Sequence, residues 1–218
     1  MADVNPRKAY ASPLRERQAA LTRRAVLDAA RELFVDRGYT ATTIDAIADR
    51  AGVSKPTVFS AVGNKQTLLK TLRDVAFTGD EAPAAVRDRP HVEAIRAEPD
   101  RRRAVELIAK HLTAVAGRYA ELHEVLRAAA HGSDKELRDL WEAEQREGLA
   151  GAGFWVGILA EKGPLPAGMA RRAAVDVMWL LMTPDHYYRL VHQRGWSQRR
   201  YESWLADTIT RLLLDEGS

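Results

Sequence analysis

The segment over residues 42–65 constrains the fold of this chain more than any other part of the sequence. Its apolar side chains recur at positions i, i+3, i+4 and i+7, the stripe of one short amphipathic helix: Ile44, Ile47, Ala48 and Ala51. Gly52 follows where such a helix would end and the backbone needs a positive φ. Ser54 is a good N-cap for a second helix, and Pro56 is tolerated in the first turn of that helix. The segment therefore predicts two short helices joined by a tight turn.

A helix-turn-helix unit of this kind places its second helix in the major groove of DNA, and an ordinary αα-hairpin is the alternative. Lys55 and Thr57 project from the start of the second helix. They are candidates to touch base edges, because Lys can donate to guanine and the Thr methyl group can meet a thymine methyl. Thr42 or Thr43 is expected to cap the first helix and to direct its N–H groups at a phosphate.

The residues on both sides of this unit extend the pattern. An amphipathic segment precedes it, ends at Gly38, and carries apolar residues on one face: Val26, Leu27, Ala30, Leu33 and Phe34. After the unit, residues 63–65 (Gly-Asn-Lys) are expected to cap a further helix that carries Leu68 and Leu69.

The order of these features resembles the DNA-binding domain of the tetracycline-repressor (TetR/AcrR) family. It runs Leu-Phe, Gly-Tyr, Thr-Thr, Ile-Ala, Ala-Gly-Val-Ser, Thr-Val-Phe and Lys-x-x-Leu over about residues 22–70 without a gap. The resemblance implies a helix-turn-helix domain followed by a helical domain for effector binding and dimerisation. It also implies that Lys65 contacts a phosphate, and it matches Tyr39 to the family's aromatic residue after glycine.

The sequence departs from the family pattern in the second helix of the unit. Phe59 stands where the family usually has Tyr, whose hydroxyl commonly binds a phosphate; a lost hydrogen bond of this kind costs about 1 kcal/mol. Ala61 and Val62 replace residues that are commonly aromatic, and Ser60 is an alternative phosphate donor. The predicted DNA-binding residues are Thr42, Thr43, Ser54, Lys55, Pro56, Thr57, Phe59, Ser60 and Lys65.

The distribution of charge agrees with a DNA-binding N-terminal part. Residues 1–70 hold 12 Lys or Arg and 7 Asp or Glu, a net charge of +5, whereas residues 71–218 hold 21 basic and 23 acidic residues, a net charge of −2. Basic side chains favour binding to phosphates through counterion release. Residues 1–20 are predicted to be a flexible basic arm, which either follows phosphates or is only a solvated tail.

Composition excludes several classes of protein. The 218 residues contain no Cys, so a disulfide framework and a thiolate metal site are excluded. The polar start has no apolar signal region, and no apolar run approaches the roughly 20 residues that span a bilayer. We expect a cytoplasmic protein. Catalytic motifs, metal-ligand spacings and a cofactor-binding fingerprint are not found, so the sequence predicts neither an enzyme nor a cofactor.

The second half of the sequence is predicted to be entirely helical. Apolar residues repeat at helical spacing over 100–117, 119–131 and 134–162, where Gly117 and Gly132 are read as helix ends. Gly148, Gly151 and Gly153 weaken the middle of the third helix, where a kink is plausible. Two further helices follow, the first of which breaks at Thr183-Pro184. The predicted fold class is all-α, with domains at residues 21–70 and 71–218.

The helix over residues 175–182 is apolar on more than one face, so one side is expected to need a partner. In proteins of the family that this sequence resembles, the two final long helices pair across a two-fold axis. We therefore expect a homodimer that binds a palindromic operator, although burial within one subunit is the alternative.

The resemblance also implies an effector pocket whose occupancy is linked to DNA binding, most commonly as a ligand-responsive repressor. Candidates are large residues on inward stripes, which suit an apolar or aromatic small molecule: His111, Tyr119, Leu122, Leu126, Trp141, Trp155, Met178, Trp179 and Met182. Each is also a good core residue. The alternative function is a constitutive DNA-binding or protein-docking helical module without an effector.

Overall fold

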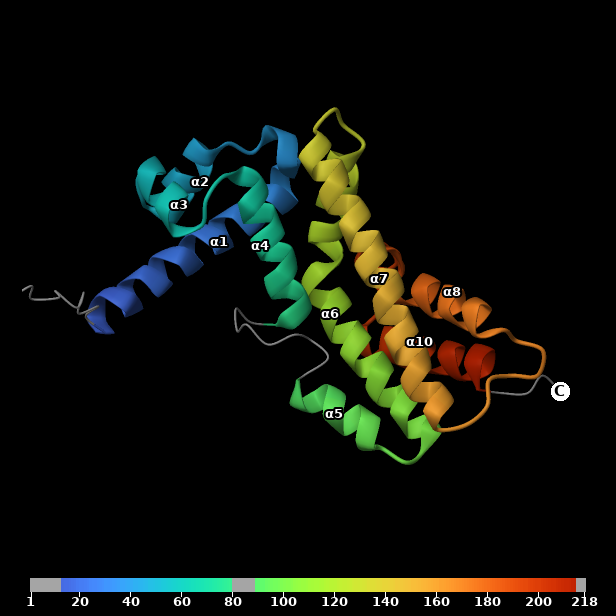
Figure 1. Cartoon of the computed structure of the whole chain (residues 1–218). Helices are drawn as coiled ribbons and strands as arrows, with labels where there is room; N and C mark the ends of the chain where they lie inside the picture. Colours follow the sequence, from blue (N-terminus) through green and yellow to red (C-terminus); the bar gives the residue numbers. More distant parts are fainter. Residues whose placement is uncertain (1–12, 80–88, 215–218) are drawn as a thin grey trace, which may run out of the picture. The chain divides into compact units, whose positions relative to one another are not determined.

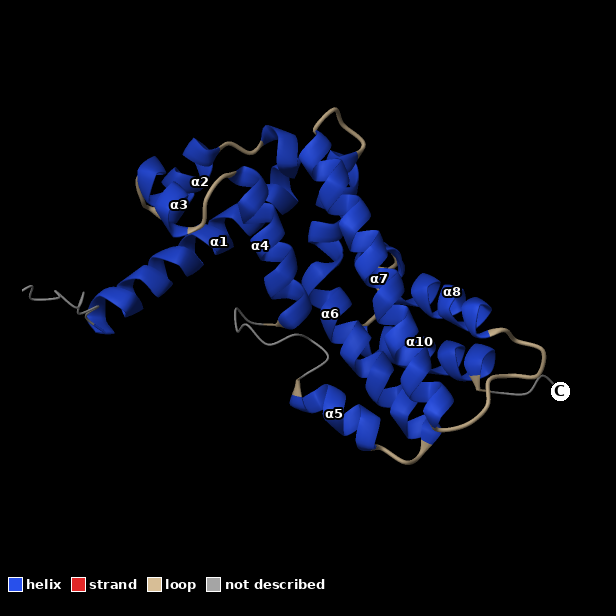
Figure 2. Cartoon of the chain, in the orientation of Figure 1, coloured by secondary structure: helices blue, strands red, loops and turns tan. Residues whose placement is uncertain are grey.

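The computed structural model describes residues 13–79 and 89–214, and every regular element in these two ranges is a helix (Figures 1 and 2). The all-α prediction is therefore confirmed. The chain divides into two compact units, Met1–Leu69 and Lys70–Ser218. Most of the predicted basic arm, including Arg7 and Lys8, lies outside the described residues.

The first unit consists of α1 (Pro13–Ala41), α2 (Ile44–Ala51), α3 (Lys55–Ala61) and the start of α4 (Lys65–Thr78). Helices α1, α2 and α3 pack against one another. Gly38 leaves the helical conformation with φ 77°, as its role of terminator requires. The buried side chains of the unit come from all four helices: Val26, Leu27, Ala30, Phe34, Ile47, Val58, Leu68 and Leu69.

Helix α1 begins earlier than predicted. Residues 13–20 were expected to belong to a flexible arm, but they form the first turns of α1. Pro13 is accepted at the first helical position, and the Leu, Arg, Glu, Gln and Ala residues that follow it are all good helix formers.

The second unit consists of the rest of α4 and of the helices that follow it in the chain. They are α5 (Pro90–Ala97), α6 (Arg101–Ala130), α7 (Lys135–Glu161), α8 (Arg171–Met182), α9 (Pro184–Tyr187), the π-helical turn η2 (Tyr188–Gln193) and α10 (Gln198–Leu213). Asp100, Asp134 and Ser197 cap α6, α7 and α10, because each side chain accepts a first-turn N–H. Helix α6 packs against α5, α7, α9 and α10, and α8 packs against α7 and α10. Among the described residues, no helix has the length and apolar character to cross a bilayer.

Helix α6 is one element where the sequence predicted two. Gly117 does not end the helix; it lies inside α6, which runs to Ala130. A Cβ at Gly117 would lie 3.2 Å from Oη of Tyr187 in α9. The glycine therefore marks a close approach of another helix rather than a terminus.

Two glycines of α7 also mark a close approach of another helix. The helix continues through Gly148 and Gly151. A Cβ at Gly148 would lie 3.3 Å from Nε1 of Trp179, and one at Gly151 would lie 3.5 Å from Cε of Met182. Both contacts are with α8, so these glycines admit the large side chains of α8 against α7.

A polar network is buried between α6, α7 and α9. Nδ1 of His123 lies 2.7 Å from Oε1 of Glu144, and its Nε2 lies 3.0 Å from Oδ2 of Asp185. Tyr119 donates its hydroxyl to the same Glu144 carboxylate, and Thr183 donates to Asp185 over 2.5 Å. His123 is 2 % exposed and Glu144 6 % exposed.

Two carboxylates hold this histidine protonated. Burial alone would lower the pKa of His123, but the hydrogen bonds to Asp185 and Glu144 outweigh it and raise the pKa to about 9. The hydrogen bond from His123 in turn lowers the pKa of Asp185 well below its usual range. The imidazolium therefore donates from both ring nitrogens and links three helices.

Candidate nucleic-acid interface

Helix α3 is held with one face in the core and the other in solvent. Ser54 is its N-cap: Oγ of Ser54 accepts from the backbone N–H of Thr57 over 3.3 Å. Val58 is fully buried, whereas Lys55, Pro56, Phe59 and Ser60 are exposed. On the buried side, Arg23 of α1 donates to the carbonyl of Ala61 over 2.7 Å, at the C-terminal end of α3. A short helix fixed at both ends thus presents polar and aromatic groups outward.

The turn between α2 and α3 has the geometry that the sequence predicts. Gly52 adopts the left-handed conformation with φ 65° and ψ 34°, and its N–H reaches the carbonyls of Ala48 and Asp49. The N–H of Val53 donates to the carbonyl of Ala48 over 3.0 Å. These bonds satisfy the last carbonyls of α2 and fix the direction in which α3 leaves.

The two threonines before α2 have different roles. Thr43 is the N-cap, since its Oγ1 accepts from the N–H of Ala46 over 3.1 Å, and its side chain is exposed. Thr42 is 1 % exposed, and its hydroxyl donates to the carbonyls of Leu33 and Gly38 over 3.0 and 2.8 Å. The expected DNA contact of Thr42 therefore has no route in this arrangement, and a phosphate contact by Thr43 stays a prediction.

Lys65 binds backbone rather than pointing into solvent. Its ammonium donates to the carbonyls of Tyr39 and Thr42 over 2.9 and 2.8 Å. It also lies 4.2 Å from the centre of the Tyr39 ring, within cation–π range. This role of Lys65 has no local signal in the sequence, because the contacts join residues far apart in the chain. A phosphate contact by Lys65 stays a prediction, and the structure adds a role in holding α4 to the end of α1.

Lys55 forms an ion pair with an acidic residue of α2. Its Nζ lies 3.0 Å from Oδ2 of Asp45 in α2, and both side chains are more than half exposed. An exposed pair of this kind stabilises a protein by no more than about 1 kcal/mol, so Lys55 can leave it for a stronger partner. Asp45 is the acidic neighbour of the predicted base-reading lysine.

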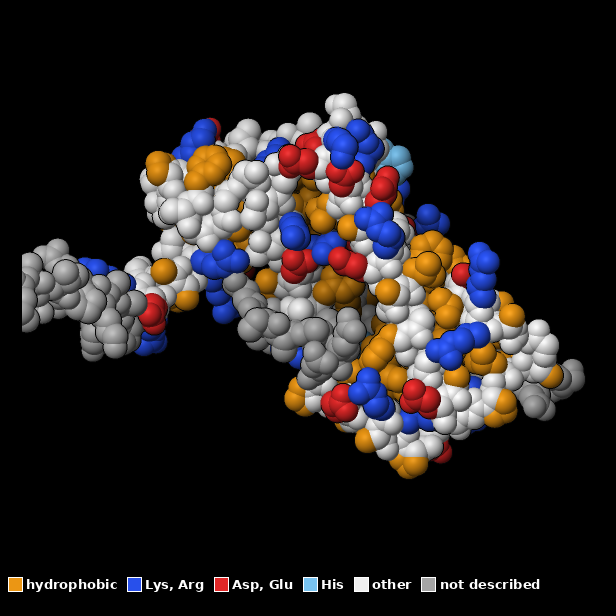
Figure 3. Space-filling model, in the orientation of Figure 1, with side chains coloured by type: hydrophobic (Ala, Val, Ile, Leu, Met, Phe, Trp, Pro, Cys, Tyr) orange, Lys and Arg blue, Asp and Glu red, His pale blue; other side chains and the backbone are white. Residues whose placement is uncertain are grey.

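Other predicted contact residues differ in how they are placed. Phe59 is 47 % exposed, so its ring is available for apolar contact without a hydrogen bond. Ser60 donates its hydroxyl to the carbonyl of Thr57 over 3.0 Å, and Thr57 is half-buried with Oγ1 2.7 Å from Oγ of Ser54. On the face that Figure 3 shows, the Lys and Arg side chains of the first unit are scattered rather than gathered into one patch.

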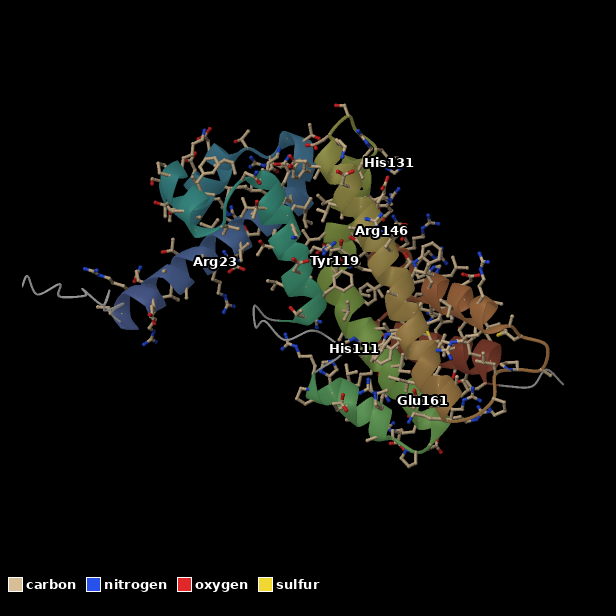
Figure 4. The ribbon with its side chains drawn as sticks, viewed as in Figure 1. Arg23, His111, Tyr119, His131, Arg146 and Glu161 are labelled. Carbon is tan, nitrogen blue, oxygen red and sulfur yellow. The ribbon has the colours of Figure 1, made fainter. Side chains whose placement is uncertain are left out.

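The second unit contains a cavity of about 390 Å³. It is lined by the end of α4, by α5 and the residue before it, and by α6: Phe77, Thr78, Gly79, Arg89, His91, Ala94, Ile95, Leu107, Lys110, His111, Ala114 and Arg118. Figure 4 labels His111 on α6, the helix against which α5 packs.

Only His111, of the nine predicted effector residues, is among the residues that line this cavity. The others form core contacts, because large residues on inward stripes fill the space between helices. Five are buried: Tyr119, Leu122, Leu126, Trp155 and Met178. Trp141, Trp179 and Met182 are half-buried. The sequence missed the basic lining residues, although Lys110, His111 and Arg118 share one side of the helical repeat over 107–118.

The N-terminal part of the chain matches a known family of regulators. Residues 26–72 match the family described as bacterial regulatory proteins, tetR family. The HTH-type transcriptional regulator YvkB of Bacillus subtilis is 47% identical over 51 residues, which are 23% of this chain and 27% of YvkB. The HTH-type transcriptional activator FasR of Mycolicibacterium smegmatis is 56% identical over 43 residues, 20% of each chain. The matched segment thus spans about a quarter or less of these curated relatives.

Solved structures share the fold over nearly the whole chain. NalD of Pseudomonas aeruginosa, the secondary repressor of the MexAB-OprM multidrug efflux pump, has a TM-score of 0.65 at 21% identity and covers 92% of this chain and 100% of its own. A transcriptional regulator of Saccharomonospora viridis in complex with choline has a TM-score of 0.65 at 16% identity, over 90% and 100%. The SmeT–triclosan complex has a TM-score of 0.61 at 18% identity, over 90% and 93%.

Proposed function

Because residues 26–72 match the tetR family of bacterial regulatory proteins, we propose that this chain is a transcriptional regulator that binds a palindromic operator as a homodimer. The family consists of regulators and not of enzymes. We propose repression as its role, which is the commoner role in the family, and release from the operator by a small molecule. The cytoplasm, where chromosomal DNA is accessible, is the compartment that this function requires.

The observation that carries the proposal is the placement of α3. Ser54 caps the helix, Gly52 directs it, and Val58 anchors its inner face in the core. Lys55 and Phe59 are exposed on the outer face of α3. The helix that would enter the major groove therefore offers a charged donor and an apolar ring. Thr43 adds the N-terminus of α2 as a phosphate site.

Exposed apolar side chains support a homodimer through α8 and α10. Leu180 of α8 is 56 % exposed and Leu212 of α10 is 44 % exposed. Trp179 and Trp204 on the same two helices are half-buried, and α8 packs against α10. Figure 3 shows hydrophobic side chains over α8. A second copy would cover this surface, and a two-fold axis would present two recognition helices to a palindromic site.

The cavity supports the response to a small molecule. Helix α4 is one continuous element, from Lys65 in the first unit to Phe77 and Thr78, which line the cavity in the second. A ligand that favours one position of the end of α4 therefore changes the affinity for DNA, and by linkage DNA changes the affinity for the ligand by the same factor. Two proteins of similar fold have been solved in complex with triclosan and with choline, which supports a response to a small molecule.

Replacing Lys55 or Thr57 by Ala is expected to change which operator sequence is preferred. The loss of a base contact costs about 1–3 kcal/mol at one position of the site and nothing at the others. A gel-shift titration against the DNA upstream of the protein's own gene and against single-position variants of that DNA measures this preference. Arg37→Ala, on the exposed part of α1, is the control. Binding without sequence preference in the parent protein, or no binding, would refute the proposed function.

Replacing Asp45 by Asn is expected to raise the affinity for DNA. The change frees Lys55 from its ion pair and removes a negative charge from beside the recognition helix. Removing an acidic neighbour at this distance is expected to strengthen binding several-fold at low salt, on the order of 1 kcal/mol, and less at high salt. Fluorescence anisotropy at two salt concentrations measures it. Asp49→Asn, on the same helix and also exposed, should have a smaller effect. Equal affinities of the parent and D45N would show that Asp45 does not restrain Lys55.

A further inference from the structure

We propose that the cavity between α4, α5 and α6 binds a small organic anion, in which an acid group is joined to an apolar or aromatic body. The inference rests on the proposed function, because this anion would be the effector that releases the operator. It adds an acid group to the apolar or aromatic small molecule that the sequence predicts.

The charge of the lining carries the first part of the inference. Arg89, Lys110 and Arg118 bring three positive side chains to the cavity, and none of the described lining residues is acidic. Arg89 is the N-cap of α5, while Lys110 and Arg118 lie eight residues apart on α6. Guanidinium groups bind carboxylates and other oxyanions through paired N–H donors, so this set of side chains suits an acid group.

The two histidines of the lining show the same positive environment. His91 and His111 stack with ring centres 4.8 Å apart. The pKa of His111 is lowered to about 4, first by burial and then by the neighbouring His91 and Arg118. His111 is therefore neutral near pH 7, and a further cation is disfavoured beside it. A choline-like ligand would be repelled here, whereas an anion would be attracted.

Apolar groups provide room for the body of the ligand. Phe77 of α4, Ile95 of α5 and Leu107 of α6 line the cavity together with the stacked imidazole rings. Its volume of about 390 Å³ lies in the range of small-molecule sites. A flat aromatic body can lie against the exposed faces of such rings.

Arg118 connects the cavity to α4. Its Nε donates to the carbonyl of Ala76 over 2.8 Å, in the last turn of α4. Burial lowers the pKa of Arg118. An acid group on Arg118 would share or replace the bond to Ala76, and thus act on the helix whose other end holds Lys65.

The test compares two fluorescent probes with the same aromatic body. Anilinonaphthalene sulfonate is an anion, and phenylnaphthylamine is its uncharged counterpart. We expect the anion to bind the full chain at least about tenfold more tightly, since hydrogen bonds to charged groups are the stronger class. Arg118→Met should weaken binding of the anion by about tenfold or more and leave binding of the neutral probe within about twofold. Lys110→Met, at an exposed position, should weaken binding of the anion by a smaller factor.

Arg103→Met is the matched control, because Arg103 is an exposed arginine of α6 outside the cavity lining. Thermal melting of each variant checks the fold, and K110M keeps the test decisive if R118M does not fold. Equal affinity for the two probes, or an unchanged preference in K110M and R118M, would overturn the inference. Operator binding that persists in that case leaves the proposed function intact. A preference for the anion in a protein that shifts no DNA would contradict the proposed function alone.

Discussion

Replacing His123 by Gln is expected to lower the melting temperature by roughly 6–20 °C. The imidazolium of His123 joins the buried carboxylate of Glu144 to Asp185, over 2.7 and 3.0 Å. Removing one member of a buried charged network typically costs about 3–5 kcal/mol, because the remaining charges stay buried without compensation. For a chain of this size, each kcal/mol corresponds to about 2–4 °C in melting temperature. Differential scanning calorimetry measures the change.

His131→Gln is the control, because His131 is exposed at the end of α6. A second variant tests the coupling: Glu144→Gln should cost much less in the H123Q background than in the parent chain. If H123Q melts within about 2 °C of the parent, or if the two substitutions are additive, the network does not depend on a charged histidine.

The same histidine is expected to make the protein less stable as the pH rises. The pKa of His123 is raised from 6.5 to about 9 in the folded chain, so its contribution is present in full below pH 6.5 and is lost as the pH approaches 9. The size of the loss is about 3 kcal/mol. Asp185 acts with the opposite sign, because its pKa is lowered from 3.8 and its contribution is lost only in acid. H123Q should therefore flatten the fall in stability between pH 6.5 and 9.

The helix-turn-helix could be predicted because its signals are local. The cap at Ser54 and the left-handed Gly52 act within a few residues of their own positions, so sequence spacing is enough to place them. The role of Lys65 could not be predicted in this way. Its carbonyl partners on Tyr39 and Thr42 lie 26 and 23 residues earlier in the chain. Periodicity carries no information about such contacts.

The roles of the glycines and the position of the cavity also depend on contacts between residues far apart in the chain, so sequence spacing could not predict them. Gly117 looks like a helix end, but its neighbour Tyr187 lies far along the chain in α9. Inward apolar stripes predicted effector residues, yet a stripe that packs well closes the space that a ligand needs. The cavity forms instead where basic residues such as Arg118 interrupt the apolar face, and those residues cannot close against one another.

Replacing Leu180 by Glu is expected to split the proposed homodimer and to abolish its tight binding to the proposed operator. Leu180 is 56 % exposed in one subunit, so the substitution should leave the fold of that subunit unchanged. Two-fold symmetry places the change twice in the same interface, and each buried unpaired carboxylate costs roughly 3 kcal/mol or more. The dissociation constant of the dimer should therefore rise by at least about 1000-fold. Sedimentation velocity measures the dissociation of the dimer, and fluorescence anisotropy measures the affinity of the protein for DNA.

Leu149→Glu is the matched control, because Leu149 is 44 % exposed and lies on α7 rather than on α8 or α10. Binding to a half-site distinguishes loss of the dimer from damage to α3, either of which would weaken binding to the full palindrome. A monomer with an intact α3 still contacts one half-site, so L180E should keep weak binding to a half-site while it loses the gain from the full palindrome. If L180E stays a dimer while L149E becomes a monomer, the interface lies on α7, and pairing through α8 and α10 is wrong.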